Sequence, residues 1–247
     1  MRHLLVINPN TSQSVSDLLQ VHAQRAAGPQ VHVHTVTARF GAPYIACEAS
    51  YAVAAHATLD AWAAALSNDM TSPDAVLIGC FGDPGLLALR ETSTAPVTGL
   101  ADAAFAEAAR HGRFAIVTGG ERWKPMLTRL ARDLGHEAQL AGIHSVAPTG
   151  AQLASDPLAA RLVLANACRQ AMHAFKVNAI ILGGAGLAGM AEAIQDELGF
   201  PVIDSVMAGT RHALQSTTLA DARASGRFDV AWQNVSSELA ARGHPSP

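Results

Sequence analysis

Cys80 is the residue whose type and position most favour chemistry in this chain. It follows the apolar run Ala75 to Gly79, which is typical of a buried parallel strand, and it precedes Asp83-Pro84, which is typical of a helix start. The unpaired N–H groups of a helix start favour a thiolate, the form of cysteine that acts as a base or nucleophile. We therefore predict a reactive Cys80 with a pKa below the free-thiol value of about 8.5. The alternative is a buried, inert thiol.

A second stretch of the chain repeats the pattern around Cys80. Ala75 to Cys80 aligns without a gap on Ala179 to Gly184, so a glycine occupies the thiol's place in the later copy. The likeness continues beyond the turn, where Pro96-Val97 and Pro201-Val202 each precede an alanine-rich helical pattern. We expect two related halves that face each other across one cleft, with Cys80 on one side and Gly184 on the other.

Two further turns are candidates for binding. Asn8 to Ser12 follows the strand Leu4 to Ile7 and offers polar side chains and free N–H groups, which suit an anion such as a carboxylate but also simply make turns. Thr118-Gly119-Gly120 is a glycine turn after the strand Phe114 to Val117, without the spacing of a dinucleotide or phosphate loop. Tyr44, in the loop Gly41 to Cys47, is placed to reach the cleft. We infer no nucleotide.

Strands and helices alternate along the chain, which predicts an α/β fold with a mainly parallel, four-stranded, doubly wound sheet in each of two pseudo-symmetric lobes. The expected lobes are residues 1–98 plus 208–247 and residues 99–207, with the active site in the cleft between them. The other expected elements are strands at Val31–Val36, Val97–Gly99, Gln139–Val146 and Ala179–Gly183, and helices at Gln13–Ala27, Glu48–Leu66, Ala101–His111, Lys124–Leu134, Asp156–Phe175, Asp204–Thr218 and Phe228–Ala241.

The composition excludes several classes of function. The chain has 247 residues, 49% of them hydrophobic and 15% charged, with a net charge of −3 and no basic block, so neither a nucleic acid nor a membrane surface is an expected partner. No apolar run is long enough to span a membrane, and the expected location is the cytoplasm. The three cysteines Cys47, Cys80 and Cys168 lack metal-ligand or disulfide spacing. The pair His32 and His34 makes no metal site without a third ligand.

The chain resembles the aspartate/glutamate/hydantoin racemase superfamily over nearly its whole length, and within it the hydantoin racemases most closely. Leu5 to Ser12 is similar to the family's opening signature, Gly79 to Leu86 to its first cysteine motif, and Val117 to Trp123 to its third motif. The second motif normally carries a cysteine after Leu-Gly. This chain has Gly184 at that position.

The resemblance implies a cofactor-independent and metal-independent isomerase that acts on a small molecule with a carboxylate or a hydantoin ring, and we expect a homo-oligomer. Such a racemase needs two acid/base groups on opposite faces of a carbon next to a carbonyl. Backbone N–H groups at four turns would hold carboxylate or carbonyl oxygens and stabilise the enolate. The expected binding residues are Asn8, Asn10, Thr11, Tyr44, Phe81, Gly82, Thr118, Gly119, Gly120, Ala185 and Gly186.

The glycine at position 184 leaves three hypotheses. The first is a racemase-like enzyme of the hydantoin branch, with Cys80 on one face and water, His212, Tyr44, Cys47 or the substrate itself on the other. The second is a one-thiol decarboxylase of the arylmalonate decarboxylase type, in which loss of carbon dioxide makes the carbanion and one thiol suffices. The third is a small-molecule binding protein without catalysis.

Overall fold

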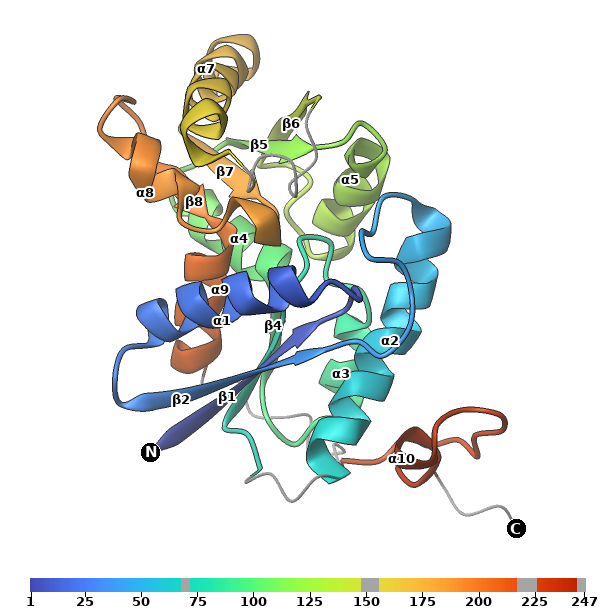
Figure 1. Cartoon of the computed structure of the whole chain (residues 1–247). Helices are drawn as coiled ribbons and strands as arrows, with labels where there is room; N and C mark the ends of the chain where they lie inside the picture. Colours follow the sequence, from blue (N-terminus) through green and yellow to red (C-terminus); the bar gives the residue numbers. More distant parts are fainter. Residues whose placement is uncertain (68–71, 148–155, 217–225, 244–247) are drawn as a thin grey trace.

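Two parallel β-sheets of four strands each organise the chain (Figure 1). The computed structural model describes residues 1–67, 72–147, 156–216 and 226–243. The strands are β1 (Arg2–Asn8), β2 (Val31–Thr37), β3 (Ala75–Ile78), β4 (Val97–Gly99), β5 (Phe114–Gly119), β6 (Leu140–Val146), β7 (Ala179–Gly183) and β8 (Val202–Asp204). The first sheet has the order β2-β1-β3-β4 and the second the order β6-β5-β7-β8, and every pairing is parallel. The two sheets therefore share one topology.

The helices pack on both faces of each sheet, as the apolar strands require. They are α1 (Gln13–Ala27), α2 (Glu48–Ser67), α3 (Leu86–Thr92), α4 (Leu100–Ala109), α5 (Trp123–Asp133), α7 (Pro157–Phe175), α8 (Met190–Gln195), α9 (Ser205–Gln215) and α10 (Ser237–Ala240), with a 3₁₀ turn η1 (Ala185–Leu187). In β1, Leu4 and Val6 face one core cluster with α1, and Leu5 and Ile7 face another with α2. The prediction of a doubly wound α/β fold is confirmed.

One core cluster joins the two lobes. It contains Leu77 of β3 and Ile116 of β5 together with Leu19 of α1, Phe105 of α4 and Val206 of α9. Figure 1 shows α1, α4 and α9 between the two sheets, and α9 contacts both α1 and α4. The lobes thus pack through a continuous apolar layer. The exact lobe limits remain a prediction.

The predicted helix start at Asp83-Pro84 is wrong. Helix α3 begins at Leu86, after Gly85 with a φ of 86°. The Asp83 carboxylate instead accepts hydrogen bonds from the N–H groups of Ala101 and Asp102, at 3.0 and 2.7 Å, in the first turn of α4. Gly99, the residue before α4, has no side chain with which to cap the helix. A Cβ at Gly99 would collide with the Asp83 carboxylate, so the glycine makes room for a cap from elsewhere in the chain.

Residues 226–243 pack against α2 rather than forming the predicted helix over Phe228–Ala241. Only Ser237–Ala240 is helical there, and Asn234 has a φ of 57°, which interrupts any longer helix. The Phe228 ring lies 5.9 Å from the Trp62 ring of α2, centroid to centroid, so aromatic packing replaces helical hydrogen bonding. The predicted helix Asp204–Thr218 ends at Gln215, and its last residues lie outside the described part of the chain.

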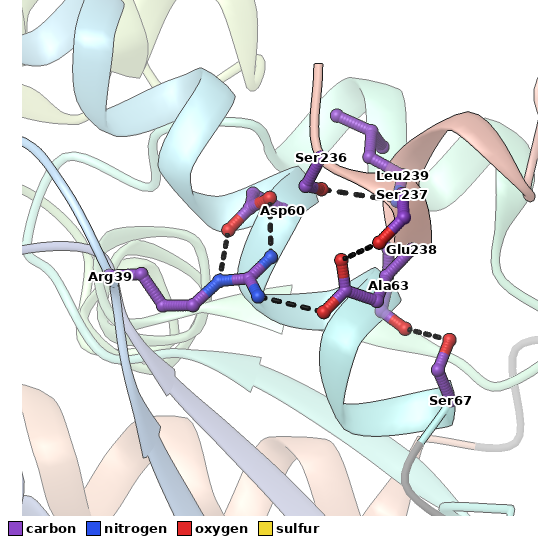
Figure 2. A network of polar contacts seen from close by, with 8 residues as sticks. All are labelled: Arg39, Asp60, Ala63, Ser67, Ser236, Ser237, Glu238 and Leu239. Carbon is purple, nitrogen blue, oxygen red and sulfur yellow. Dashed lines mark hydrogen bonds and ion pairs between the residues drawn. The ribbon is translucent and has the colours of Figure 1, made fainter.

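Arg39 joins this C-terminal segment to α2 (Figure 2). Its guanidinium donates to both carboxylate oxygens of Asp60, at 2.8 and 2.9 Å, and to Glu238 Oε1 at 2.7 Å. Ser236 caps α10 by accepting a hydrogen bond from the N–H of Leu239. The Arg39 bridge therefore ties the segment 226–243 to α2.

Candidate active site

A pocket of about 90 Å³ lies between the carboxyl ends of the central strands of the two sheets. Four strand-end turns contribute to it: Asn10 follows β1, Cys80 and Phe81 follow β3, Thr118 and Gly119 end β5, and Gly184 to Leu187 follow β7. Parallel strands bring their carboxyl ends to one edge of a sheet, so two sheets that face each other gather all four turns. Tyr44 closes the pocket from the loop before α2.

Four of the predicted binding residues do not line this pocket: Asn8, Thr11, Gly82 and Gly120. Asn8 is fully buried and holds the turn together, since its Nδ2 donates to Asn10 Oδ1, to the Ser12 carbonyl and to Ser16 Oγ, at 3.0, 3.0 and 2.9 Å. Its role in this structure is to shape the turn. The side chains of Asn10 and Ser12 line the pocket instead.

Several backbone N–H groups of the predicted cradle already donate hydrogen bonds within the protein. The N–H of Asn10 donates to Asn8 Oδ1, that of Thr11 to the Ala42 carbonyl and that of Gly82 to the Cys80 carbonyl. The N–H of Gly120 donates to the Val146 carbonyl. The four-turn cradle predicted from the sequence is therefore wrong at these positions, because the turns use these groups internally.

Among the N–H groups predicted to form the cradle, those of three residues remain for a ligand. Those of Phe81, Ala185 and Gly186 make no hydrogen bond to any residue in the described ranges, and all three residues line the pocket. They approach it from both lobes, since Phe81 follows β3 and the other two follow β7. Such donors suit the oxygen of an enolate or carboxylate.

Cys80 lines the pocket, with 8% of its surface exposed. Burial raises the pKa of its thiol, and the nearby Asp83 carboxylate raises it further. The predicted lowering of the pKa is therefore wrong. Its assumed cause, a helix start beside the sulfur, is absent because α3 begins at Leu86 and because the N–H groups of Gly82 and Asp83 donate to the Cys80 carbonyl.

The Asp83 carboxyl is itself an unusual acid. Asp83 is 2% exposed, and burial raises its pKa to about 7 despite the hydrogen bonds from Ala101 and Asp102. A partly protonated Asp83 at neutral pH moderates the negative potential at the Cys80 sulfur. The thiol and the carboxyl are thus linked electrostatically, and both favour their neutral forms.

Gly184 stands across the pocket from the first-lobe turn. Its φ is 146°, a conformation that residues with a side chain rarely adopt. A Cβ built there meets only the Leu187 side chain, at 3.7 and 3.9 Å, so the position has room for a larger residue. The glycine fits its backbone conformation, and the space beside it is open.

Glycines also let the two lobes interlock around the pocket. The Phe81 ring of the first lobe lies so close to Gly183 of the second that a Cβ there would collide with it. In the other direction, a Cβ at Gly82 would come within 2.5 Å of the Trp123 ring. Each lobe therefore inserts an aromatic ring against a glycine of its partner lobe, and this fixes the width of the pocket.

The comparisons with known proteins agree with this geometry. A family model described as Asp/Glu/Hydantoin racemase matches residues 4–213. The chain belongs to this family. The predicted superfamily and the predicted isomerase class are thereby confirmed.

Individual relatives of this racemase-family chain include a hydantoin racemase from Paenarthrobacter aurescens, 34% identical over 212 residues, with 85% of this chain and 89% of that protein covered. The structure of an allantoin racemase from Klebsiella pneumoniae superposes with a TM-score of 0.81 at 32% identity, covering 87% of this chain and 86% of that one. An arylmalonate decarboxylase structure shares the fold, with a TM-score of 0.61 at 19% identity and coverage of 90% and 94%.

The sequence suggests several candidates for a second proton-transfer group, and the structure shows which of them line the pocket. His212 lies about two turns into α9 and does not line the pocket. Cys47 is half-buried beside Ser50, with its sulfur 3.5 Å from the serine hydroxyl, and it does not line the pocket either. Tyr44 does, and its hydroxyl donates to the Gly119 carbonyl at 3.4 Å. Burial raises the pKa of Tyr44, so its phenol is protonated at neutral pH.

Sequence reasoning missed some of the pocket wall. Leu187, Ile45 and Val15 contribute apolar surface to it, and Trp123 contributes its ring. An aromatic residue shortly after the Gly119-Gly120 turn was the available signal for Trp123. The apolar residues give no signal of their own, because core and pocket positions look alike in a sequence.

Within the described ranges, no group of three or more His, Cys, Asp or Glu side chains is arranged to hold a metal ion. The His32 ring packs edge-on against His3, at 5.6 Å between centroids, rather than pairing with His34 toward a third ligand. Among the described helices, none combines the length and the apolar character that crossing a membrane requires.

Proposed function

We propose that this protein is a racemase-like enzyme of the hydantoin branch in which Cys80 transfers a proton at a carbon next to a carbonyl. The substrate class is a small molecule with a hydantoin-like ring or a carboxylate. One observation carries the proposal: the Cys80 thiol and three free N–H groups, those of Phe81, Ala185 and Gly186, converge on one pocket between the lobes. A proton donor beside oxyanion donors is what enolate chemistry requires.

The chemistry is asymmetric between the two faces of the pocket. The raised pKa makes the Cys80 thiol a proton donor at neutral pH, and its scarce thiolate a strong base. The opposite face has glycine at position 184. A protonated Tyr44 or a water molecule would supply the second proton there. We expect inversion of the substrate to be slower than exchange of its α-hydrogen on the Cys80 face.

A second candidate function follows from the same asymmetry. If the substrate carries a second carboxylate on the reacting carbon, loss of carbon dioxide leaves an enolate without any base. The protonated Cys80 thiol then delivers one proton to one face. The absence of a side chain at Gly184 and the raised pKa of Cys80 favour this decarboxylase chemistry specifically.

Proton NMR in deuterated buffer distinguishes these functions. The purified protein is incubated with 5-substituted hydantoins, amino acids and disubstituted malonates, and exchange, inversion and carbon dioxide release are followed together. Exchange and slower inversion of a hydantoin support the racemase-like function. Carbon dioxide release with a single product enantiomer supports the decarboxylase. If no substrate in any class reacts, the proposal fails.

A further inference from the structure

Two consecutive residues, Asp204 and Ser205, hold both ends of the loop Gly184–Gly189, which forms the second-lobe side of the pocket. The Gly184 N–H donates to Ser205 Oγ at 3.3 Å, and the Gly189 N–H donates to Asp204 Oδ2 at 2.6 Å. We infer that Asp204 and Ser205 are positioning residues, which fix the direction of the Ala185 and Gly186 N–H groups. This inference rests on the proposed function, in which those groups bind the enolate oxygen.

Both anchors are buried. Ser205 is 1% and Asp204 8% exposed. The second carboxylate oxygen of Asp204 accepts from the N–H groups of Val206 and Met207, at 2.9 and 3.1 Å, and so caps α9. One side chain therefore joins the helix that packs between the lobes to the loop that lines the pocket. The position of α9 therefore helps to fix the position of the loop.

A hydrogen bond supplements packing at the far end of the loop, where Leu187 and Ala188 are buried. Behind Gly189 and Asp204 lies a second cavity, of about 270 Å³, which is also lined by His22 of α1. His22 touches Gly189 so closely that a Cβ there would collide with its ring. The 2.6 Å hydrogen bond to Asp204 therefore adds a polar constraint at the edge of this open space.

The inference predicts a kinetic signature. Oxyanion donors act mainly when charge develops in the transition state, so loosening them lowers kcat more than it raises KM. A purely structural role would lower the melting temperature and leave kcat unchanged at temperatures where the protein is folded. The two roles are therefore separable.

The test uses two variants that each release one end of the loop. Ser205→Ala removes the acceptor for the Gly184 N–H. Asp204→Asn keeps an oxygen to cap α9, since Asn caps helices as well as Asp does, and replaces the oxygen that faces Gly189. Ser205→Thr retains the hydroxyl and serves as the rescue. Asp156→Asn is the matched control, because Asp156 caps α7 by accepting from Ala159 and does not touch the loop.

We expect kcat to fall at least about tenfold in Ser205→Ala and Asp204→Asn, with KM changed by less than about threefold. Ser205→Thr should recover most of the activity, and Asp156→Asn should match the parent. Hydrogen exchange at Gly184–Gly189 should accelerate in the first two variants only. A kcat within about twofold of the parent in both, while Cys80→Ala is inactive, would overturn the positioning role alone. If Cys80→Ala also retained activity, the proposed function would fail and the positioning role with it.

Discussion

The turn that follows β3 and the turn that follows β7 occupy the same place in two sheets of one topology, yet they carry different chemistry. Ile78 pairs with Gly99 in the first sheet, and Leu182 pairs with Asp204 in the second, so Gly99 and Asp204 are structural counterparts. The first turn has a thiol, Cys80. The second has Gly184 in that position.

The carboxylates have exchanged places as well. In the first lobe the turn supplies the carboxylate, Asp83, and the strand end is Gly99. In the second lobe the strand end supplies it, Asp204, and the turn has Gly189. In both lobes a buried carboxylate links the turn to the helix after the edge strand. The two halves keep this interaction but place the carboxylate at different positions. Position-by-position alignment of the halves therefore does not reveal the interaction.

Removing the thiol should have the largest effect. We expect Cys80→Ala to lose at least about 100-fold in turnover, because a positioned acid/base contributes roughly that much. The melting temperature should change little, since the substitution removes one sulfur beside an existing pocket. Cys168→Ala is the control, because Cys168 is fully buried in a cluster on α7, away from the pocket. Steady-state kinetics on both variants is the measurement, and near-parental activity of Cys80→Ala would rule out its assignment.

A cysteine at position 184 would give both turns a thiol and should increase inversion of the substrate. Gly184→Cys places a thiol in open space beside Leu187, and we expect it to increase inversion relative to exchange. The φ of 146° makes the substitution strained, with an expected loss of about 1–3 kcal/mol in unfolding free energy. Gly184→Ala should show the same loss without the inversion. Chiral chromatography and thermal melts check both expectations, and a folded Gly184→Cys that binds substrate without inversion would contradict the two-face comparison.

Alkylation should rank the thiols by environment. Burial and Asp83 raise the pKa of Cys80, whereas hydrogen bonds from Ser50 lower that of Cys47. Iodoacetamide at neutral pH should therefore modify Cys47 first, and the alkylation midpoint of Cys80 should lie above the free-thiol value of about 8.5. Mass spectrometry of peptides across a pH series gives both rates. If Cys80 reacted first at neutral pH, the buried, neutral state of the first turn would be refuted.

A further expected effect concerns the pH dependence of stability. The Asp83 pKa is about 7 in the folded protein and 3.8 in an unperturbed residue, so the folded state binds the proton more tightly. Its stabilising contribution is present below about pH 4 and is lost as the pH rises through 7. Asp83→Asn removes this loss, and the melting temperature of the variant relative to the parent should increase over that range. A constant difference between the two would contradict the prediction, and the exposed Asp156→Asn serves as the control.

The strands and most helices were predictable because their signals are local. The run Ala179–Gly183 is buried at every residue, and α1 covers the predicted range Gln13–Ala27. The placement of Cys80 and Gly184 in one pocket followed from the repeat. These features depend on residues that are neighbours in sequence or on a pattern that recurs.

The remaining features depend on contacts between distant parts of the chain. Nothing near Asp83 in the sequence indicates that its partners are Ala101 and Asp102, so a local cap was the natural expectation. The predicted direction of the Cys80 pKa shift was wrong for the same reason, since the shift depends in part on where the Asp83 carboxylate lies. Phe228 looked like part of a helical face, but its partner is Trp62.

The segment that covers Trp62 also bears on where a stable fragment can end. The family model stops at residue 213, but Phe228 and Leu239 belong to the same core cluster as Trp62, and Arg242 lies over the Trp62 ring at 5.6 Å. A fragment cut at the family boundary would leave the surface of this indole open to water and to other molecules. The sequence that defines the family is therefore shorter than the unit that this chain needs to bury Trp62.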